Sequence, residues 1–152
     1  MMIYLMRHGE AEQKALSDPA RELTHKGIMD NRSVIAKLSQ HAPEIDRALT
    51  SPYQRARQTC SALLTSYPQL SFEVSEALEP ESGVYDLLDE IEKVDVMQVF
   101  LISHNPLISN LLALLVDGTL ATSSDMETSH IACVSMDIVA PGCGKVLYTL
   151  SP

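Results

Sequence analysis

Positive charge is scarce in this chain of 152 residues. It has 11 lysines and arginines against 20 aspartates and glutamates, which gives a formal net charge of -9. Nucleic acids and anionic membranes attract proteins largely through basic residues. The composition therefore argues against both as general partners, and any site that binds an anion must be local.

Long apolar runs and paired cysteines are also lacking. The longest apolar run, 107–116, is about half the length of a membrane span. Cys60, Cys133 and Cys143 are odd in number and lie outside metal-ligand spacings, so reduced thiols are the default, with a Cys133–Cys143 disulfide as the alternative. Because no charged-then-apolar leader precedes Met2, we expect a cytoplasmic protein.

The sequence motifs of several common enzyme classes are absent as well. There is no glycine-rich Walker loop, no dinucleotide-binding fingerprint, no Gly-x-Ser-x-Gly elbow and no internal repeat. The length suits one domain over residues 1–152, with a core that needs no disulfide or metal to fold.

Apolar runs that predict strands alternate with patterns that predict helices. The runs lie at 2–6, 47–50, 70–74 and 96–102; the third alternates like a half-buried edge strand, and the fourth suits the centre of a parallel sheet. Helices are predicted from Thr24 to before Pro43, from Ser51 to before Pro68, and over 84–93 and 107–116, followed by a hairpin of strands 131–138 and 145–150. This order predicts an α/β fold, a three-layer α/β/α sandwich whose mostly parallel sheet the hairpin completes.

Arg7, His8 and Gly9 directly follow the first predicted strand. Ligands of open α/β sheets bind beyond the carboxyl ends of the strands, so this cation and imidazole are placed for an anionic substrate. The polar segment 10–22 shows neither the helical nor the strand period of apolar residues, and we expect a loop that covers the strand ends as a flap. Arg21 within it is either a solvated surface residue or a mobile second contact for the substrate.

A second junction of the same kind begins at Ser51. Ser51 at a helix cap, Pro52 at the first helical position and Gln54 three residues after Ser51 each favour a helix start. Arg55 then lies in the first turn, beside free amides of the helix terminus, a combination suited to phosphate.

A third junction holds His104 and Asn105. Asn105 can cap the next helix and Pro106 can open it, so His104 lies before a helix terminus that favours an anion. If the sheet is parallel here, all three junctions meet at one edge, and we count Ser51 and Asn105 among the candidate substrate-binding residues. Arginines and helix termini around one imidazole fit phosphoryl transfer.

These motifs resemble those of the histidine phosphatase superfamily. Its Arg-His-Gly motif corresponds to residues 7–9, its Ser-x-x-x-Arg-Ala-x-x-Thr motif to 51–59, and its later Ser-His motif to 103–104. Within the superfamily the chain looks most like the SixA-type phosphohistidine phosphatases. It is short, has Arg21 in a similar Ser-Asp-x-x-Arg-x-Leu-Thr context, and lacks the long insertions of the phosphoglycerate mutases.

The resemblance implies a phosphoglycerate mutase-like fold and a reaction without metal or cofactor. Neutral His8 would attack phosphorus while a backbone carbonyl holds its other nitrogen, and water would then hydrolyse the covalent phosphohistidine. Arg7, Arg55 and protonated His104 would bind the phosphoryl oxygens, and Arg21 would add a contact from the flap. Neighbouring cations lower the pKa of an imidazole, which keeps His8 neutral but also disfavours a protonated His104.

The general acid of the wider family has no clear counterpart in the acidic tract 76–83, where Glu79 is the candidate. The imidazole of a phosphohistidine leaves far more readily than an alkoxide, so a weak acid favours a phosphohistidine-containing phosphorelay or phosphotransfer protein as substrate. Two alternatives remain: a phosphomonoesterase or mutase acting on small phosphate esters, and a non-catalytic phosphate-binding module.

Overall fold

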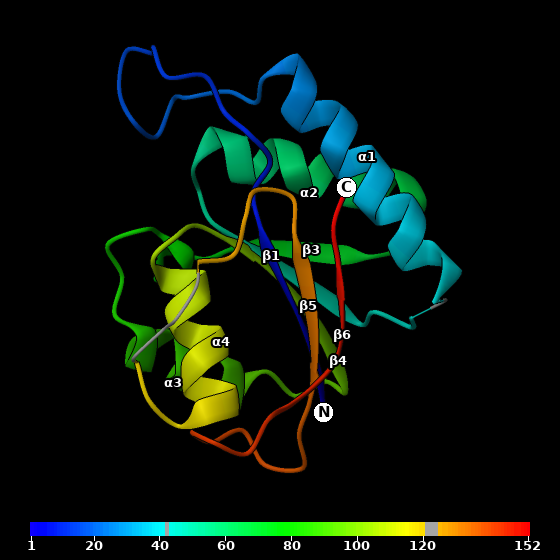
Figure 1. Ribbon diagram of the computed structural model, residues 1–152, viewed down its shortest axis with the longest axis vertical. Helices are drawn as coiled ribbons and strands as arrows, with labels where there is room; N and C mark the ends of the chain where they lie inside the picture. The colour runs from blue at the N-terminus through cyan, green and yellow to red at the C-terminus, as the bar shows by residue number, and fades with distance from the viewer. Residues whose placement is uncertain (42, 121–124) are drawn as a thin grey trace.

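The computed structural model, which describes residues 1–41, 43–120 and 125–152, is built on one six-stranded sheet (Figure 1). Its strands are β1 (Met2–Arg7), β2 (Arg47–Thr50), β3 (Ser71–Val74), β4 (Gln98–Ser103), β5 (Ile131–Ser135) and β6 (Lys145–Leu150). The spatial order is β3-β2-β4-β1-β5-β6. The first four strands run parallel, and β5 and β6 add an antiparallel hairpin, as predicted.

Helices cover both faces of the sheet. They are α1 (His25–Gln40), α2 (Gln54–Ser66), α3 (Val84–Lys93) and α4 (Leu107–Asp117), with a short 3-10 turn, η1 (Glu76–Leu78). In Figure 1, α1 and α2 lie on one side of the sheet and α3 and α4 on the other. This arrangement confirms the predicted three-layer α/β/α sandwich.

Each face of the sheet has its own apolar core. Successive side chains of a strand point to opposite faces. Tyr4 and Phe100 accordingly pack under α1 and α2, whereas Leu5 and Leu101 pack in the core that includes α3 and α4. All four are at most 1% exposed. This double burial explains why β1 and β4 are nearly continuous apolar runs in the sequence.

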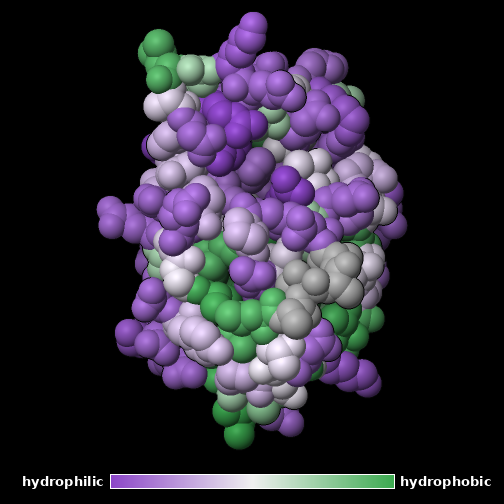
Figure 2. All heavy atoms as spheres, turned by 60° about the vertical axis from the view of Figure 1, so that its left-hand side comes forward, coloured by the Kyte–Doolittle hydropathy of each residue, from purple (hydrophilic) through white to green (hydrophobic). Residues whose placement is uncertain are grey.

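Register brings the polar junctions together. Arg7 of β1 is paired with Ser103 of β4, and Thr50 of β2 is paired with Ile102 of β4. The three strands are parallel and end level with one another, so the residues that follow them emerge at the same edge. The upper part of the face in Figure 2, where Figure 1 places this edge and the loop 10–22, is mostly hydrophilic.

Two predicted helix starts are wrong in detail. Helix α2 begins at Gln54 after the cap residue Tyr53, and the Ser51 hydroxyl, which accepts from the Tyr53 amide at 3.3 Å, also lies 2.7 Å from a ring nitrogen of His104. Helix α4 begins at Leu107 without a side-chain cap, because the side-chain oxygen of Asn105 accepts from the Ser109 hydroxyl at 2.7 Å, while its amide nitrogen donates to the carbonyl of Met126. In both places the predicted cap residue lies before the helix start, and its side chain also bonds to another segment of the chain.

The edge strand and the hairpin also differ from prediction. β3 lies at the sheet edge as expected, but all four of its residues are exposed, including Phe72 at 43%, because α2 packs over β2 and β4. β5 ends at Ser135, earlier than the predicted 138. The three cysteines are free thiols, so the alternative Cys133–Cys143 disulfide does not form. Within the described residues, none of the helices has the length and apolar character to cross a membrane.

Candidate active site

His8 extends the sheet by one residue beyond β1. Its backbone amide donates to the carbonyl of Ser103 at 3.0 Å, and its ring is buried. The ring nitrogen Nδ1 lies 2.7 Å from the carbonyl oxygen of Gly9. A carbonyl only accepts, so Nδ1 carries the proton and Nε2 keeps a free lone pair. His8 therefore has the tautomer of a nucleophile that attacks through Nε2.

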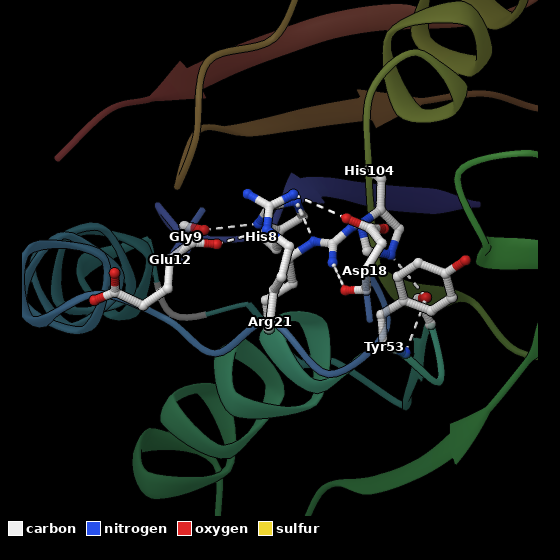
Figure 3. A network of polar contacts seen from close by, with 9 residues as sticks. His8, Gly9, Glu12, Asp18, Arg21, Tyr53 and His104 are labelled. Carbon is white, nitrogen blue, oxygen red and sulfur yellow. Dashed lines mark hydrogen bonds and ion pairs between the residues drawn. The ribbon is translucent and has the colours of Figure 1, made fainter. Parts of the chain in front are cut away.

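Arg55, the second residue of α2, is buried against this nucleophile. Its Nε donates to Nε2 of His8 at 3.1 Å. Its Nη1 donates to the backbone carbonyl of Asp18 at 2.7 Å, and its Nη2 donates to a carboxylate oxygen of Asp18 at 3.0 Å (Figure 3). The guanidinium thus joins the strand-end site to the loop 10–22.

His104 follows β4 as His8 follows β1, and the two rings lie side by side. Their centroids are 4.8 Å apart, and the ring of Tyr53 meets His104 edge-on at 5.0 Å. Nε2 of His104 is 2.7 Å from the hydroxyl oxygen of Ser51. Its Nδ1 is buried without a hydrogen-bond partner in the described parts of the chain. Ser51 thus orients His104, and one nitrogen of this imidazole is left for a ligand.

Burial keeps both imidazoles neutral at pH 7. It lowers the pKa of His8 to about 4, against the hydrogen bond to Gly9, and the charges of Arg55 and Arg7 lower it further. Burial likewise lowers the pKa of His104 to about 2, with His8 and Arg55 adding to the effect. The free site therefore does not favour the protonated His104 that the resemblance implies. A bound phosphoryl dianion would raise this pKa again.

Arg7 is anchored to the segment before β5. Its Nη1 donates to the carbonyl of Met126 at 2.8 Å, and the Asn105 amide donates to the same carbonyl at 2.9 Å. The Nε of Arg7 is buried and has no partner in residues 1–41, 43–120 and 125–152. The structure thus gives Asn105 a contact that supports Arg7 through Met126, while its predicted contact with substrate stays a prediction.

Arg21 lies beside His8 on the loop 10–22 (Figure 3). Its Nε donates to the carbonyl of Glu12 at 2.6 Å, and its Nη1 forms an ion pair with Asp18 at 2.9 Å. Its charge contributes to the lowered pKa of His8. Of the two interpretations of Arg21, the structure favours a loop residue directed at the site.

Glu79 lies at the end of η1, where its charge helps to raise the pKa of Tyr53, after burial as the main cause. The turn is fixed to the sheet because the Ser103 hydroxyl donates to the carbonyl of Leu78 at 2.8 Å. Ser103 of the Ser-His motif therefore positions η1, and the general-acid role of Glu79 stays a prediction.

A buried polar network that the sequence analysis missed supports the loop after His8. The Thr59 hydroxyl accepts from the amide of Gly9 at 3.2 Å and from the Asn31 side chain at 3.0 Å. The Ser129 hydroxyl donates to Asn31 at 2.8 Å, and the Ser129 amide donates to the carbonyl of Arg7. Asn31 had a signal in the sequence, since it interrupts the apolar stripe of its helix.

Gly9 is required by this network. A Cβ atom there would lie 2.8 Å from both the Asn31 amide nitrogen and the carbonyl oxygen of Gly27. Such an approach to a fixed backbone carbonyl forces the loop to shift, so the third position of the Arg-His-Gly motif admits no side chain.

A cluster of three or more histidine, cysteine, aspartate or glutamate side chains that could hold a metal ion does not occur in the described ranges. The chemistry that the site offers is nucleophilic: a neutral imidazole whose Nε2 is unprotonated and accepts from Arg55, surrounded by three arginines.

Comparison with known proteins agrees with this description. Residues 3–93 match the histidine phosphatase superfamily (branch 1). The whole chain is 35% identical to phosphohistidine phosphatase SixA of Escherichia coli (strain K12), of which the match covers 94%. A SixA homolog of Haemophilus influenzae is 34% identical over 74% of this chain and 76% of that protein.

Among solved structures, protein histidine phosphatase SixA complexed with tungstate superposes with a TM-score of 0.87 at 34% identity, over 100% of this chain and 97% of that one. The chain therefore belongs to the histidine phosphatase superfamily, as its three motifs implied.

Proposed function

We propose that this chain is a cytoplasmic phosphohistidine phosphatase, which removes phosphate from a histidine of a phosphotransfer protein through a covalent phosphohistidine on His8. The hydrogen bond from Nδ1 of His8 to the Gly9 carbonyl carries the proposal, because it leaves Nε2 unprotonated beside Arg55. The identity to the Escherichia coli phosphohistidine phosphatase over the whole chain supports the substrate class.

In the first step, Nε2 of His8 attacks the phosphorus atom of the substrate. A bond forms between Nε2 and phosphorus as the bond between phosphorus and the substrate imidazole nitrogen breaks. The imidazole ring of His8 gains positive charge, which the Gly9 carbonyl stabilises through Nδ1. Arg55 already donates to Nε2, so the arriving phosphoryl oxygen takes over this N–H as the attack proceeds.

Two buried nitrogens mark where the other phosphoryl oxygens bind. Nε of Arg7 and Nδ1 of His104 lack hydrogen-bond partners within the described residues. Buried polar groups are nearly always paired, so an unpaired one calls for a ligand or water. If the Ser51 hydroxyl donates to Nε2 of His104, Nδ1 carries the proton and donates to a phosphoryl oxygen. Neutral His104 can play this part without a charge.

In the second step, water attacks the phosphohistidine and releases phosphate, returning the lone pair to Nε2 of His8. The imidazole of the substrate leaves readily, so the first step asks little of a general acid. Hydrolysis of a phosphate ester asks more, because the alkoxide must be protonated as it leaves. Small phosphate esters are the second candidate substrates, which the wider superfamily and the acidic tract around Glu79 favour.

The direct test is release of phosphate from a phosphohistidine-containing domain by the wild-type chain and by His8→Ala. A labelled phosphoenzyme that is acid-labile and absent from His8→Ala is the expected second result. Equal rates for the two proteins would refute the proposal. Turnover of sugar or glycerate phosphates well above that of the phosphoprotein would favour the esterase instead. Binding of phosphate without turnover or phosphoenzyme would favour the non-catalytic module.

A further inference from the structure

The loop 10–22 places a carboxylate against two of the arginines of the phosphate site. One carboxylate oxygen of Asp18 accepts from Nη2 of Arg55 at 3.0 Å, and the other accepts from Nη1 of Arg21 at 2.9 Å (Figure 3). The backbone carbonyl of Asp18 accepts from Nη1 of Arg55 at 2.7 Å. Each of the three guanidinium nitrogens of Arg55 therefore already donates within the protein, two of them to Asp18.

This contact is unusual for a site that must bind a dianion. A phosphate group that enters next to His8 shares Arg55 and Arg21 with the negative charge of Asp18. Like charges in one site oppose each other, and a carboxylate paired with arginine stays ionised at neutral pH. The hydrogen bond from Arg21 is the main cause that holds the pKa of Asp18 below its ordinary value.

The other residues of the site are not shared between a phosphate group and Asp18 in this way. Arg7 donates to the neutral carbonyl of Met126, and the nearby charges of Asp125 and Glu127 act on it from the segment before β5. His8 and His104 are neutral rings. Asp18 thus offsets cationic charge at Arg55 and Arg21, the two arginines that it contacts.

We infer that Asp18 is a specificity-determining residue: its carboxylate weakens the binding of free phosphate and small phosphate esters, so that efficient turnover requires a substrate with further contacts outside the phosphoryl pocket. This inference rests on the proposed function, since it assumes that the phosphoryl group binds at His8 and Arg55. A phosphoprotein can supply such contacts, whereas a small ester cannot. Weak binding of free phosphate also lets the product leave.

The test is calorimetric titration of inorganic phosphate into wild type, Asp18→Asn and Asp18→Ala. Asparagine keeps an oxygen acceptor for Arg55 but has no charge, and alanine removes both. We expect each variant to bind phosphate about tenfold more tightly than wild type, the effect of one half-exposed charge in such a site. Because Asp18 is a half-exposed loop residue, both variants should fold, and a thermal melt by circular dichroism verifies this.

Glu12→Gln is the matched control. It removes the same charge from the same loop, but Glu12 meets Arg21 only through its backbone carbonyl, and its carboxylate points away from the arginines (Figure 3). We expect its phosphate affinity to stay within about twofold of wild type, because an exposed charge at a distance is largely screened. If Glu12→Gln also bound phosphate tenfold more tightly, the effect of Asp18→Asn would reflect the overall charge of the loop, and the inference would be overturned.

Kinetics add a readout that separates selection from simple positioning. In Asp18→Asn, the KM for p-nitrophenyl phosphate should fall, and the ratio of kcat/KM for phosphoprotein to that for this ester should drop about tenfold. If Asp18 only orients Arg55, phosphate affinity falls or stays the same and kcat falls for both substrates, which overturns the inference. The proposed function fails separately, if wild type does not hydrolyse phosphohistidine; the phosphate titration does not depend on that activity.

Discussion

The site has two halves that are held in different ways. His8 and His104 follow strand ends, Arg55 lies in the first turn of α2, and the three are 7%, 1% and 3% exposed. Asp18 and Arg21 come from the loop 10–22, and their side chains are 51% and 29% exposed. The first half is fixed by strand register and by the Thr59 network; the second is fixed by backbone hydrogen bonds, such as that from the Gln54 amide to the Pro19 carbonyl, and by ion pairs of Asp18 with Arg21 and Arg55.

The difference indicates a division of labour. A buried site with a low local dielectric holds fixed dipoles and charges in place, and such preorganisation is what phosphoryl transfer requires. The ion pair within the loop, between Asp18 and Arg21, is solvated and contributes only about 0–1 kcal/mol, so the loop half is less firmly fixed than the buried half. We therefore expect substitutions in the buried half to change the rate of chemistry, and substitutions in the loop half to change which phosphates bind.

Removal of the nucleophile should have the largest effect. His8→Ala should lower kcat for phosphohistidine hydrolysis by a factor on the order of 10⁴ or more, since no covalent intermediate can form. The measurement is phosphate release under single-turnover conditions. His25→Ala, which removes an exposed histidine at the start of α1, is the control and should match wild type. A small loss in His8→Ala would assign the nucleophile elsewhere.

Arg55→Lys should follow, with kcat/KM lower by about 10²–10³. Lysine keeps the charge but lacks the planar fork that donates to His8 and Asp18 at once. The matched control is Arg57→Lys, an exposed arginine on the same helix, which should leave the kinetics unchanged. An effect of Arg55→Lys on KM alone would contradict the assignment of Arg55 to the buried, catalytic half.

The two neutral imidazoles predict how stability depends on pH. Their pKa values in the folded chain, about 4 for His8 and about 2 for His104, lie below the ordinary 6.5 of an unfolded histidine. As the pH falls below 6.5, the unfolded chain therefore binds more protons, and the free energy of unfolding decreases. The contribution of His8 is fully present above this pH and decreases by on the order of 3 kcal/mol by pH 4.

Urea denaturation of wild type and His8→Asn between pH 7 and about 5 tests this dependence, because the variant lacks one of the two titrations and should show a flatter curve. Parallel curves for His8→Asn and wild type would mean that His8 is not held neutral by burial.

Asn31→Ala should separate support of the buried half from its chemistry. The substitution leaves the Ser129 hydroxyl and the Thr59 hydroxyl short of a buried partner. We expect the free energy of unfolding to fall by about 1–3 kcal/mol, with a smaller loss in kcat than in Arg55→Lys. Asn110→Ala, in the half-buried part of α4, is the control for loss of a helical asparagine. Equal losses in the two variants would leave the network without a special role.

The sequence could predict the buried half because its signals are local. His8 and His104 each follow an apolar run that is recognisable as a central strand, and parallel pairing of β1 with β4 brings them together. Ser51 and Asn105 show the limit of local signals. Both are good capping residues for a helix start, yet their side chains bond to His104 and Met126 across the site. Bonds to distant segments such as these do not follow from a local cap preference of about 1 kcal/mol.

The loop half could not be predicted in the same way. Asp18 was predicted only as part of the loop 10–22, because its ion pair with Arg55 spans 37 residues of sequence and depends on the path of the loop. Ser129 is 98 residues from its partner Asn31. Contacts of this length follow from the assembled fold and have no counterpart in spacing or periodicity.

The smallest expected effect tests whether the chemistry of the buried half is complete without the acidic tract. Glu79 acts electrostatically on Tyr53, which packs on His104, so its charge lies at the margin of the site. If the leaving group is an imidazole, Glu79→Gln should keep phosphohistidine hydrolysis within about twofold of wild type, because no strong acid is required. Hydrolysis of p-nitrophenyl phosphate by Glu79→Gln should change equally little, since its phenolate is also a good leaving group. Glycerate phosphates, whose leaving group is an alkoxide, should lose their low turnover in this variant.

Glu81→Gln is the control for charge in the same tract. A loss of 10²-fold or more on the phosphoprotein would make Glu79 a general acid, and would mean that the chemistry extends beyond the buried half to the rim.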